Sequence, residues 1–285
     1  MGRRTVLVTG SSGKLGSDLV KSLGRDHDLV QLDVREPEDP GQRSIGRVCV
    51  GSVTDAAVLT EALEGVDTII HAAGIPGEIP DLHRLLDTNV LGTAMLLEAA
   101  GRSPTVVQFI FISSICWHGV GERPIERHRP ARLPFDETQP SLATRYYACS
   151  KAQAEYWCQK YVERFGKPCV AVRPAWIVPL DKQPAFRSVD STKGNHLFDY
   201  IGTSDLIDGI VRAMEYHPAN GFDRFLFHAT DKHSAVPSLD LAERIFPGVP
   251  VDREKLSTAD GFGAFVDCSY AREKLGWAPR YRCKR

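Results

Sequence analysis

Short apolar runs typical of β-strands alternate with amphipathic helical segments over the first 175 or so residues. The segments between the runs place apolar residues three and four apart, as on one face of a helix. Strands that alternate with helices of this length form βαβ units, so the chain is predicted to be α/β with a doubly wound parallel sheet. The strand-like runs are residues 5–9, 29–33, 47–50, 67–71, 106–112 and 169–172.

The pattern is less regular after residue 175. It predicts helices over 204–216, 238–245 and 269–275 and a strand over 224–228, with a loop over 179–196. Ser238 is expected to cap the second of these helices, and Gly276 to end the last. We therefore expect residues 1–175 to form the main domain. Residues 176–285 are expected to form a small region that is not an independent domain.

The charge balance and the cysteines exclude several classes of protein. Lys and Arg total 35 and Asp and Glu total 36, which gives no electrostatic reason to expect nucleic acid or an anionic membrane as a partner. No apolar run is long enough for a membrane span or the core of a signal peptide. The seven cysteines are scattered without a CxxC pair, so we expect no disulfide framework, no metal site and a reducing cytoplasm.

A glycine-rich turn, TGSSGKLG at 9–16, joins the first strand to the first helix. Gly10, Gly13 and Gly16 let the backbone turn sharply and approach a pyrophosphate closely, while the helix N-terminus offers N–H groups and partial positive charge. Asp33 ends the next strand, as a dinucleotide-binding motif requires. The turn therefore predicts a dinucleotide site rather than an ordinary structural turn.

Asp33 also bears on which dinucleotide binds. A carboxylate at this position accepts hydrogen bonds from the ribose hydroxyls and repels a 2′-phosphate, which favours NAD. Arg35 and Lys14 lie close by in the sequence and keep NADP open as the less favoured cofactor.

A proton-transfer group is predicted within the helix expected over 144–165. Tyr147 and Lys151 lie four residues apart and so share a helix face. A nearby ammonium favours tyrosinate, so we expect the pKa of Tyr147 to move toward working pH and the phenol to act as general acid or base. Ser113 and Ser114 follow the central strand, where ligands sit in open α/β sheets, and a serine hydroxyl there is placed to bind the reacting oxygen.

With these motifs in order, the sequence resembles the extended short-chain dehydrogenase/reductase family, also called the NAD-dependent epimerase/dehydratase family. The resemblance spans nearly the whole chain and implies a Rossmann fold with a small C-terminal substrate-binding part. It rests on TGSSGKLG (9–16), Asp33, GSVTD (51–55), DTIIHAAG (67–74), DTNVLGTAMLLEAA (87–100), FISSICWHG (111–119), FDETQP (135–140), YYACSK (146–151), VRPAWIV (172–178) and DCSYAREKLGWAPRY (267–281).

The resemblance also implies roles for single residues. Aligned on Gly119, Ser114 rather than Ser113 matches the catalytic serine, and Asn89 matches a helix asparagine that supports the active site. One position departs from the family, because Ser52 stands where an acid often meets the adenine. The implied catalytic residues are Ser114, Tyr147, Lys151 and Asn89. The implied cofactor contacts are Gly10, Ser12, Gly13, Lys14, Leu15, Asp33, Ser52, Val53, Ala72, Ala73, Tyr147, Lys151 and Pro174.

Two reactions remain open. In the family that the chain resembles, dehydration needs an acid directly after the serine, and Ile115 and Cys116 stand there instead. The resemblance also favours net oxidation or reduction of a sugar or sugar acid over nucleotide-sugar epimerisation, because epimerases of the family tend to have a longer C-terminal part. Ser114, His118 and Arg187 are the candidate substrate residues. For His118 ordinary packing, and for Arg187 a solvated loop, are equal alternatives.

A non-catalytic dinucleotide sensor is the remaining alternative, and the presence of Tyr147 and Lys151 argues for an enzyme. The helices over 82–101 and 144–165 resemble the four-helix dimer interface of the family. A homodimer with a small sugar-like substrate is therefore expected.

Overall fold

The computed structural model describes residues 2–120, 122, 127–183 and 195–284. Arg187, one of the candidate substrate residues, lies outside this part of the chain. The elements, in chain order, are β1 (Thr5–Thr9), α1 (Lys14–Leu23), β2 (Asp28–Asp33), α2 (Pro40–Arg43), β3 (Arg47–Val50), α3 (Ala56–Ala62), β4 (Thr68–His71), α4 (Leu82–Leu86), the π-helical turn η1 (Asp87–Leu91), α5 (Gly92–Arg102), β5 (Gln108–Ile112), the 3-10 turn η2 (Ile115–His118), α6 (Tyr146–Phe165), β6 (Cys169–Pro174), β7 (Trp176–Val178), the 3-10 turn η5 (Asn195–Phe198), β8 (Tyr200–Gly202), α7 (Thr203–Met214), β9 (Phe222–Phe227), α8 (Ser238–Ile245), α9 (Arg253–Leu256), α10 (Thr258–Gly261) and α11 (Ser269–Leu275).

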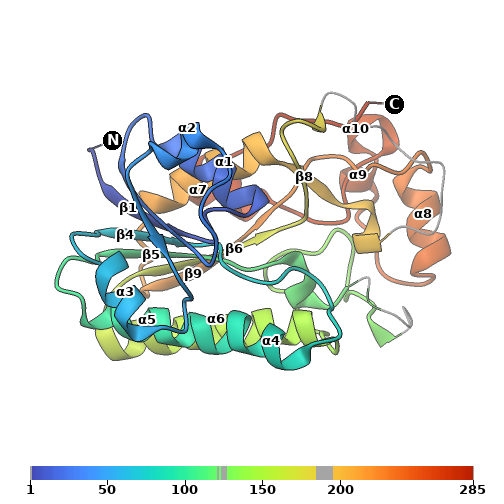
Figure 1. Ribbon diagram of the computed structural model, residues 1–285. Coiled ribbons are helices and arrows are strands. Elements are labelled where there is room, and N and C mark those ends of the chain that lie inside the picture. Colours follow the sequence, from blue (N-terminus) through green and yellow to red (C-terminus); the bar gives the residue numbers. More distant parts are fainter. Residues whose placement is uncertain (1, 121, 123–126, 184–194, 285) are drawn as a thin grey trace. The chain divides into compact units, whose positions relative to one another are not determined.

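A seven-stranded sheet organises the chain, in the order β3-β2-β1-β4-β5-β6-β9 (Figure 1). The pairs β1–β2, β1–β4, β2–β3 and β4–β5 are all parallel. The strand order reverses between β1 and β4, which is the switch point where open α/β sheets bind ligands. The register places Thr9, at the end of β1, opposite His71. The predicted doubly wound sheet is confirmed.

The chain forms two compact units that interleave along the sequence. Unit 1 comprises Met1–Ser113, Ser150–Ala171 and Ala213–Asp223, and unit 2 comprises Ser114–Cys149, Val172–Arg212 and Arg224–Arg285. In unit 1, α1 and α2 cover one face of the strands, and α3, α5 and α6 cover the other (Figure 1). Its core includes the fully buried Leu7, Ile69 and Phe109.

Unit 2 has its own hydrophobic core, built around Phe135, Leu241, Phe246 and Phe265. The parallel pair β7–β8 also belongs to this unit. Trp277 is fully buried here, and its indole N–H donates to the carbonyl oxygen of Asp205 at 2.9 Å. The apolar spacing of 238–245 thus produced a helix that packs into this second core through Leu241 and Ala242. In α11, formed by 269–275, Ala271 is buried.

Local expectations met different outcomes. Gly276 does end α11, in the left-handed conformation with φ 61°. The predicted cap Ser238 is wrong, because Pro237 precedes the helix and the Ser238 hydroxyl is instead buried and donates to the carbonyl of Gly263 at 2.7 Å. The single long helix expected from Leu82 onward is interrupted by the π-helical turn η1.

No helix in the described part of the chain is both long and apolar enough to cross a membrane. Across the same residues, no group of three or more His, Cys, Asp or Glu side chains is placed to hold a metal ion.

Candidate active site

The glycine turn after β1 is closely packed against the loop after β4. Gly10 has φ +70°, and a Cβ added there would lie 2.7 Å from the backbone nitrogen of Ala73. A Cβ on Gly16 would lie 2.0 Å from the carbonyl oxygen of Gly10. Glycine is therefore required at both positions, at Gly10 for the backbone conformation and at Gly16 for the packing of α1 on the turn.

The start of α1 fits a bound pyrophosphate. Gly13 precedes the helix, no side chain caps it, and the first turn carries no acidic residue. The Ser17 N–H already bonds the carbonyl of Gly13 at 2.9 Å, so the N–H groups of the first turn before it point out of the helix end. An uncapped helix N-terminus without acidic side chains is suited to phosphate oxygens. Lys14 is exposed at this end of the helix.

Asp33 is held beside the glycine turn. Its carboxylate accepts the backbone N–H of Ser12 at 3.0 Å and that of Arg35 at 3.1 Å. The Ser12 hydroxyl donates to the carbonyl of Arg35 at 2.8 Å, which joins the two loops. The acid therefore lies at the same end of the sheet as the phosphate cradle, where a ribose would follow the pyrophosphate.

The segment around Ser52 is folded by its own side chains. The Ser52 oxygen lies 2.7 Å from the hydroxyl of Thr54 and accepts the Thr54 N–H at 3.1 Å, while Asp55 caps α3. Val53 is buried, and a Cβ on Gly92 would lie 2.5 Å from it. The conformation of this turn is thus held by its own side chains. A cofactor contact by Ser52 or Val53 stays a prediction.

Ala72 and Ala73 are fixed by a directed chain of hydrogen bonds. The Ala73 N–H donates to the hydroxyl oxygen of Thr9 at 3.1 Å, and that hydroxyl lies 2.7 Å from Nδ1 of His71. On the other side, Nε2 of His71 lies 2.9 Å from the Thr93 hydroxyl, which donates to the carbonyl of Asn89 at 2.8 Å. Because the Thr93 hydrogen is already used, Nε2 is the protonated ring nitrogen.

The charge state of His71 agrees with this chain. Burial, helped by the ammonium of Lys151, lowers the pKa of His71 to about 3. The ring is therefore neutral at physiological pH and serves as donor on one side and acceptor on the other. It connects the end of β1, the end of β4 and the turn η1.

Asn89 lies in the π-helical turn and clamps the loop after β4. Its Oδ1 accepts the Ile75 N–H at 2.7 Å, and its Nδ2 donates to the Ile75 carbonyl and to the Ser150 hydroxyl, both at 3.1 Å. The side chain is buried and its hydrogen-bonding capacity is largely used. Asn89 thus positions the loop and the start of α6, and π-helical turns of this kind are often found at functional sites.

Lys151 is buried and directed at the end of β5. Its Nζ donates to the carbonyl of Ile112 at 2.9 Å and lies 5.0 Å from the centre of the Phe111 ring. A Cβ on Gly74 would lie 3.4 Å from both this Nζ and Oδ1 of Asn89. The missing side chain at Gly74 therefore leaves space beside the ammonium and the amide.

Ser114 and Tyr147 are hydrogen-bonded to each other within unit 2. The Ser114 oxygen accepts the Cys116 N–H at 3.1 Å, and the serine hydrogen-bonds Tyr147. Burial raises the pKa of the Tyr147 phenol, with a smaller upward contribution from Cys116, and the bond to Ser114 opposes it. The expected lowering of this pKa by Lys151 is not found, because the shift is upward and comes from burial and Cys116, opposed only by the bond to Ser114.

The structure separates the two serines after β5. The Ser113 hydroxyl is buried and donates to Oε1 of Glu155 at 2.5 Å, within the body of unit 1. Ser114 instead hydrogen-bonds Tyr147, and its role as the catalytic serine stays a prediction. Tyr147 and Lys151 lie four residues apart in the continuous helix α6, on one face of it.

His118 is placed differently from the expectation that it contacts substrate. It is fully buried, Nδ1 lies 3.0 Å from the carbonyl of Gln139, and Nε2 lies 3.2 Å from Nη1 of Arg173. The guanidinium of Arg173 also lies 3.5 Å from the centre of the Trp117 ring. Both ring nitrogens of His118 are occupied inside unit 2, which favours the packing alternative. Pro174 is buried at the end of β6.

Comparison with known proteins places the chain in a family. The model of the NAD dependent epimerase/dehydratase family matches residues 6–183. The chain therefore belongs to this family, and the NAD-dependent enzyme predicted from the glycine turn, Asp33 and the Tyr-Lys pair is confirmed at that level.

Individual relatives act on sugars. The L-arabinose 1-dehydrogenase (NAD(P)(+)) of Haloferax volcanii is 29% identical over 216 residues, which cover 74% of this chain and 82% of that protein. The uronate dehydrogenase of Pseudomonas putida is 30% identical over 172 residues, covering 59% of each chain. A short-chain dehydrogenase/reductase superfamily protein of Agrobacterium tumefaciens with bound NAD has the same fold, with a TM-score of 0.73, 21% identity, and coverage of 98% of this chain and 93% of that one.

Several positioning residues escaped the sequence analysis. Thr9 bonds Ala73, and Thr93 and Ser150 bond Asn89, but all three look like ordinary polar residues in strands and helices. Glu155 likewise went unnoticed, and it holds Ser113 rather than Ser114. One signal was available: Thr93 lies four residues after Asn89, the spacing at which a hydroxyl reaches a helix carbonyl.

Proposed function

We propose that this protein transfers a hydride between NAD and a sugar or sugar-acid substrate, with Tyr147 as general acid and base. The observation that carries the proposal is the hydrogen-bonded pair of Ser114 and Tyr147, with Lys151 one turn further along the same helix. The uncapped glycine turn before α1 supports NAD as the cofactor, and Asp33 beside it supports NAD over NADP.

In the oxidation direction, bound NAD supplies the hydride acceptor. The Ser114 hydroxyl would hold the substrate oxygen by a hydrogen bond, and Tyr147, as phenolate, would take the hydroxyl proton as the carbon gives up its hydride. The Lys151 ammonium would stabilise the phenolate and donate to the nicotinamide ribose. In reduction the same phenol returns the proton. Asn89 acts one step away, by fixing Ile75 and Ser150.

A small free sugar or uronic acid is the proposed substrate class. The L-arabinose and uronate dehydrogenases among the relatives support it. We keep Arg187 as the proposed partner of a substrate carboxylate, a role outside the described residues. Retention of both Tyr147 and Lys151 supports an enzyme over a dinucleotide sensor.

Epimerisation of a nucleotide sugar is the second candidate, because the family model includes epimerases. The chemistry at Tyr147 is shared, since an epimerase returns the hydride to the other face of the same carbon. The two reactions differ in their net product: a dehydrogenase accumulates NADH, and an epimerase does not.

We further propose a cytoplasmic homodimer. The seven cysteines are free thiols in the structure, as expected in a reducing compartment. Among the exposed large apolar side chains of unit 1, one lies in η1, Leu91 at 47%, and two lie in α6, Tyr156 at 53% and Trp157 at 43%. Two exposed aromatic residues on α6, with an exposed leucine on η1, support an interface between two copies of the chain.

The test is a panel of aldoses, uronic acids and nucleotide sugars, each with NAD or NADP, followed at the NADH absorbance. We expect NADH to accumulate with a free aldose or uronic acid and NAD. Conversion of a nucleotide sugar to its epimer without net NADH, seen by chromatography, would replace the dehydrogenase with the epimerase. Cofactor binding with no conversion of any substrate would instead support a sensor.

A further inference from the structure

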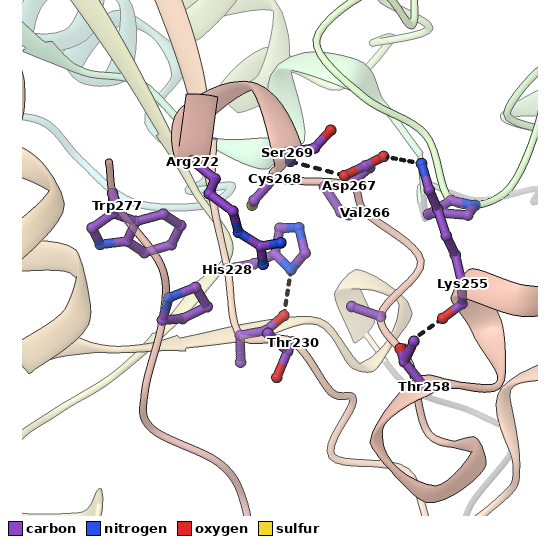
Figure 2. Close-up of a pocket in the computed structure, with 14 residues that line it drawn as sticks. His228, Thr230, Lys255, Thr258, Val266, Asp267, Cys268, Ser269, Arg272 and Trp277 are labelled. Carbon is purple, nitrogen blue, oxygen red and sulfur yellow. Dashed lines mark hydrogen bonds and ion pairs between the residues drawn. The ribbon is translucent and has the colours of Figure 1, made fainter. Parts of the chain in front are cut away.

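A cavity of about 220 Å³ lies within unit 2, beside the end of β9 (Figure 2). At about 30 Å³ per water, this is the volume of roughly seven waters, enough for a small organic molecule. Its polar wall contains His228, Thr230, Lys255, Thr258, Asp267, Ser269 and Arg272. None of the residues assigned above to the cofactor or to catalysis lines it.

His228 presents an unused acceptor in this wall. The side chain is 3% exposed, and its Nδ1 lies 2.6 Å from the carbonyl oxygen of Ala229 (the dashed bond to the ring in Figure 2). A carbonyl only accepts, so Nδ1 carries the hydrogen and Nε2 of the neutral ring is an acceptor. Burial lowers the pKa of His228 to about 4, which keeps the ring neutral at physiological pH.

Nε2 of His228 is buried and has no hydrogen-bond partner among the described residues. Buried polar atoms in folded proteins nearly always have a partner, so an exception at a cavity wall indicates a donor that enters the cavity. A ligand hydroxyl is such a donor.

Arg272 presents the opposite kind of group. Arg272 is exposed on α11 and lines the cavity. Its guanidinium makes no ion pair or hydrogen bond with the part of the chain that the structure describes. The other charges cancel, because Nζ of Lys255 lies 2.6 Å from Oδ2 of Asp267. The cavity therefore combines one net positive charge with one neutral acceptor, and it also offers the hydroxyl oxygen of Thr258, whose hydrogen is donated to the carbonyl of Lys255 at 2.7 Å.

We propose that this cavity is a second ligand site that binds a small hydroxycarboxylate. The carboxylate pairs with Arg272, and a hydroxyl donates to Nε2 of His228. A carboxylate without a hydroxyl leaves the histidine without a donor, and a neutral sugar leaves the guanidinium without an anion. Only a ligand that carries both groups satisfies both residues.

The first test measures binding of D-gluconate to the full chain saturated with NAD, by isothermal titration calorimetry. Acetate and D-glucose serve as ligands that lack the hydroxyls or the carboxylate. We expect gluconate to bind at least tenfold more tightly than either, and Arg272→Gln to weaken it at least tenfold. Lys274→Gln is the matched control, since it removes the same charge from the same helix outside the cavity, and it should change the affinity less than twofold.

The second test addresses His228. Gln keeps an acceptor near the position of Nε2, so His228→Gln should retain gluconate binding that His228→Leu loses. Should the leucine variant fail to fold, ¹⁵N NMR of the wild-type histidines decides, because a hydroxyl at Nε2 shifts that nitrogen signal. The proposal is overturned if Arg272→Gln binds gluconate as tightly as the wild type, or if gluconate binds no better than acetate and glucose. It is also overturned if gluconate binds without moving the His228 signal, which would mean that only water meets Nε2.

Discussion

The phenol of Tyr147 shows how strongly burial shapes the proposed chemistry at the level of single residues. Its pKa is raised by burial, and only the hydrogen bond to Ser114 opposes that rise. A neutral phenol is ready to donate a proton, whereas the phenolate needed to oxidise an alcohol is scarce. The raised pKa therefore moves the pH dependence of oxidation to higher pH.

For Tyr147 we expect kcat/KM for sugar oxidation to rise with pH, by about tenfold per unit below the apparent pKa, because the phenolate is the active form. Reduction should decline instead at high pH, since the phenol is then consumed. Tyr147→Phe should abolish turnover in both directions while leaving the Kd for NAD within a few fold, as titrated by protein fluorescence. If the phenylalanine variant retains turnover, Tyr147 is not the general acid and base.

Asp33 controls the cofactor preference in our proposal. Asp33→Ala removes the carboxylate that would repel a 2′-phosphate, so the ratio of kcat/KM for NAD to that for NADP should fall at least tenfold. Asp55→Ala is a control that removes a nearby carboxylate from the cap of α3. An unchanged ratio in Asp33→Ala would count against this assignment.

His71 makes the stability of unit 1 sensitive to acid. The pKa of His71 is about 3 in the folded protein and 6.5 ordinarily, so between these pH values the unfolded chain binds a proton at His71 and the folded chain does not. Its contribution is complete above pH 6.5 and is lost as the pH falls toward 3, at about 1.4 kcal/mol per pH unit. When the pH is lowered from 7.5 to 5, the free energy of unfolding should fall in both proteins, and the fall should be about 2 kcal/mol smaller in His71→Gln than in the wild type. Urea titrations at the two pH values measure this difference. Equal losses would show that His71 is not the titrating group.

Among the elements, the sequence predicted those whose signals are local and regular. The strands of the parallel sheet, the glycine turn and the face shared by Tyr147 and Lys151 all followed from spacing. The interruption at η1 did not, because a π-helical turn has the same composition as an α-helix and is set by what Asn89 and Thr93 contact. The sequence left substrate contact and packing equally open for His118, because its partner Arg173 lies far away along the chain.

The junction of β1 and α1 can be tested through Gly16. A Cβ there would lie 2.0 Å from the Gly10 carbonyl, so Gly16→Ala must push α1 away from the turn. We expect the free energy of unfolding to fall by about 1–3 kcal/mol, as for overpacked sites. We also expect the Kd for NAD to increase. Gly41→Ala in α2 meets only the flexible side chain of Asp39 at 3.2 Å and should be close to neutral. A neutral Gly16→Ala would contradict the packing argument.

At the scale of the whole molecule, the chain's two compact units are not two successive segments. Ser114–Cys149 leaves unit 1 after β5 and returns within α6, so one helix carries Tyr147 in unit 2 and Lys151 in unit 1. No local pattern in the sequence indicates such interleaving, because the interleaving depends on which distant segments share a core. Each unit has its own hydrophobic cluster, around Phe109 in unit 1 and around Phe265 in unit 2, and each cluster collects residues that lie far apart in the sequence.

The proposed dimer is tested on its exposed aromatic residues. Trp157→Glu places a charge among the apolar side chains of α6, so the protein should shift from dimer to monomer in sedimentation velocity. Val107→Glu is the control, because Val107 is 54% exposed in unit 1 outside these helices. A wild-type monomer, or a dimer indifferent to Trp157→Glu, would exclude this interface.

The turn η1 has a consequence for how the chain tolerates change. A turn closed by i to i+5 hydrogen bonds holds one residue more than an α-helical turn and covers about the same rotation. The buried stripe of α5, formed by Thr93, Leu96, Leu97 and Ala100, therefore keeps its orientation when one residue between Asp87 and Leu91 is deleted and the turn becomes α-helical. The same deletion within α5 would rotate every later side chain by about 100° and turn the rest of the stripe away from the core.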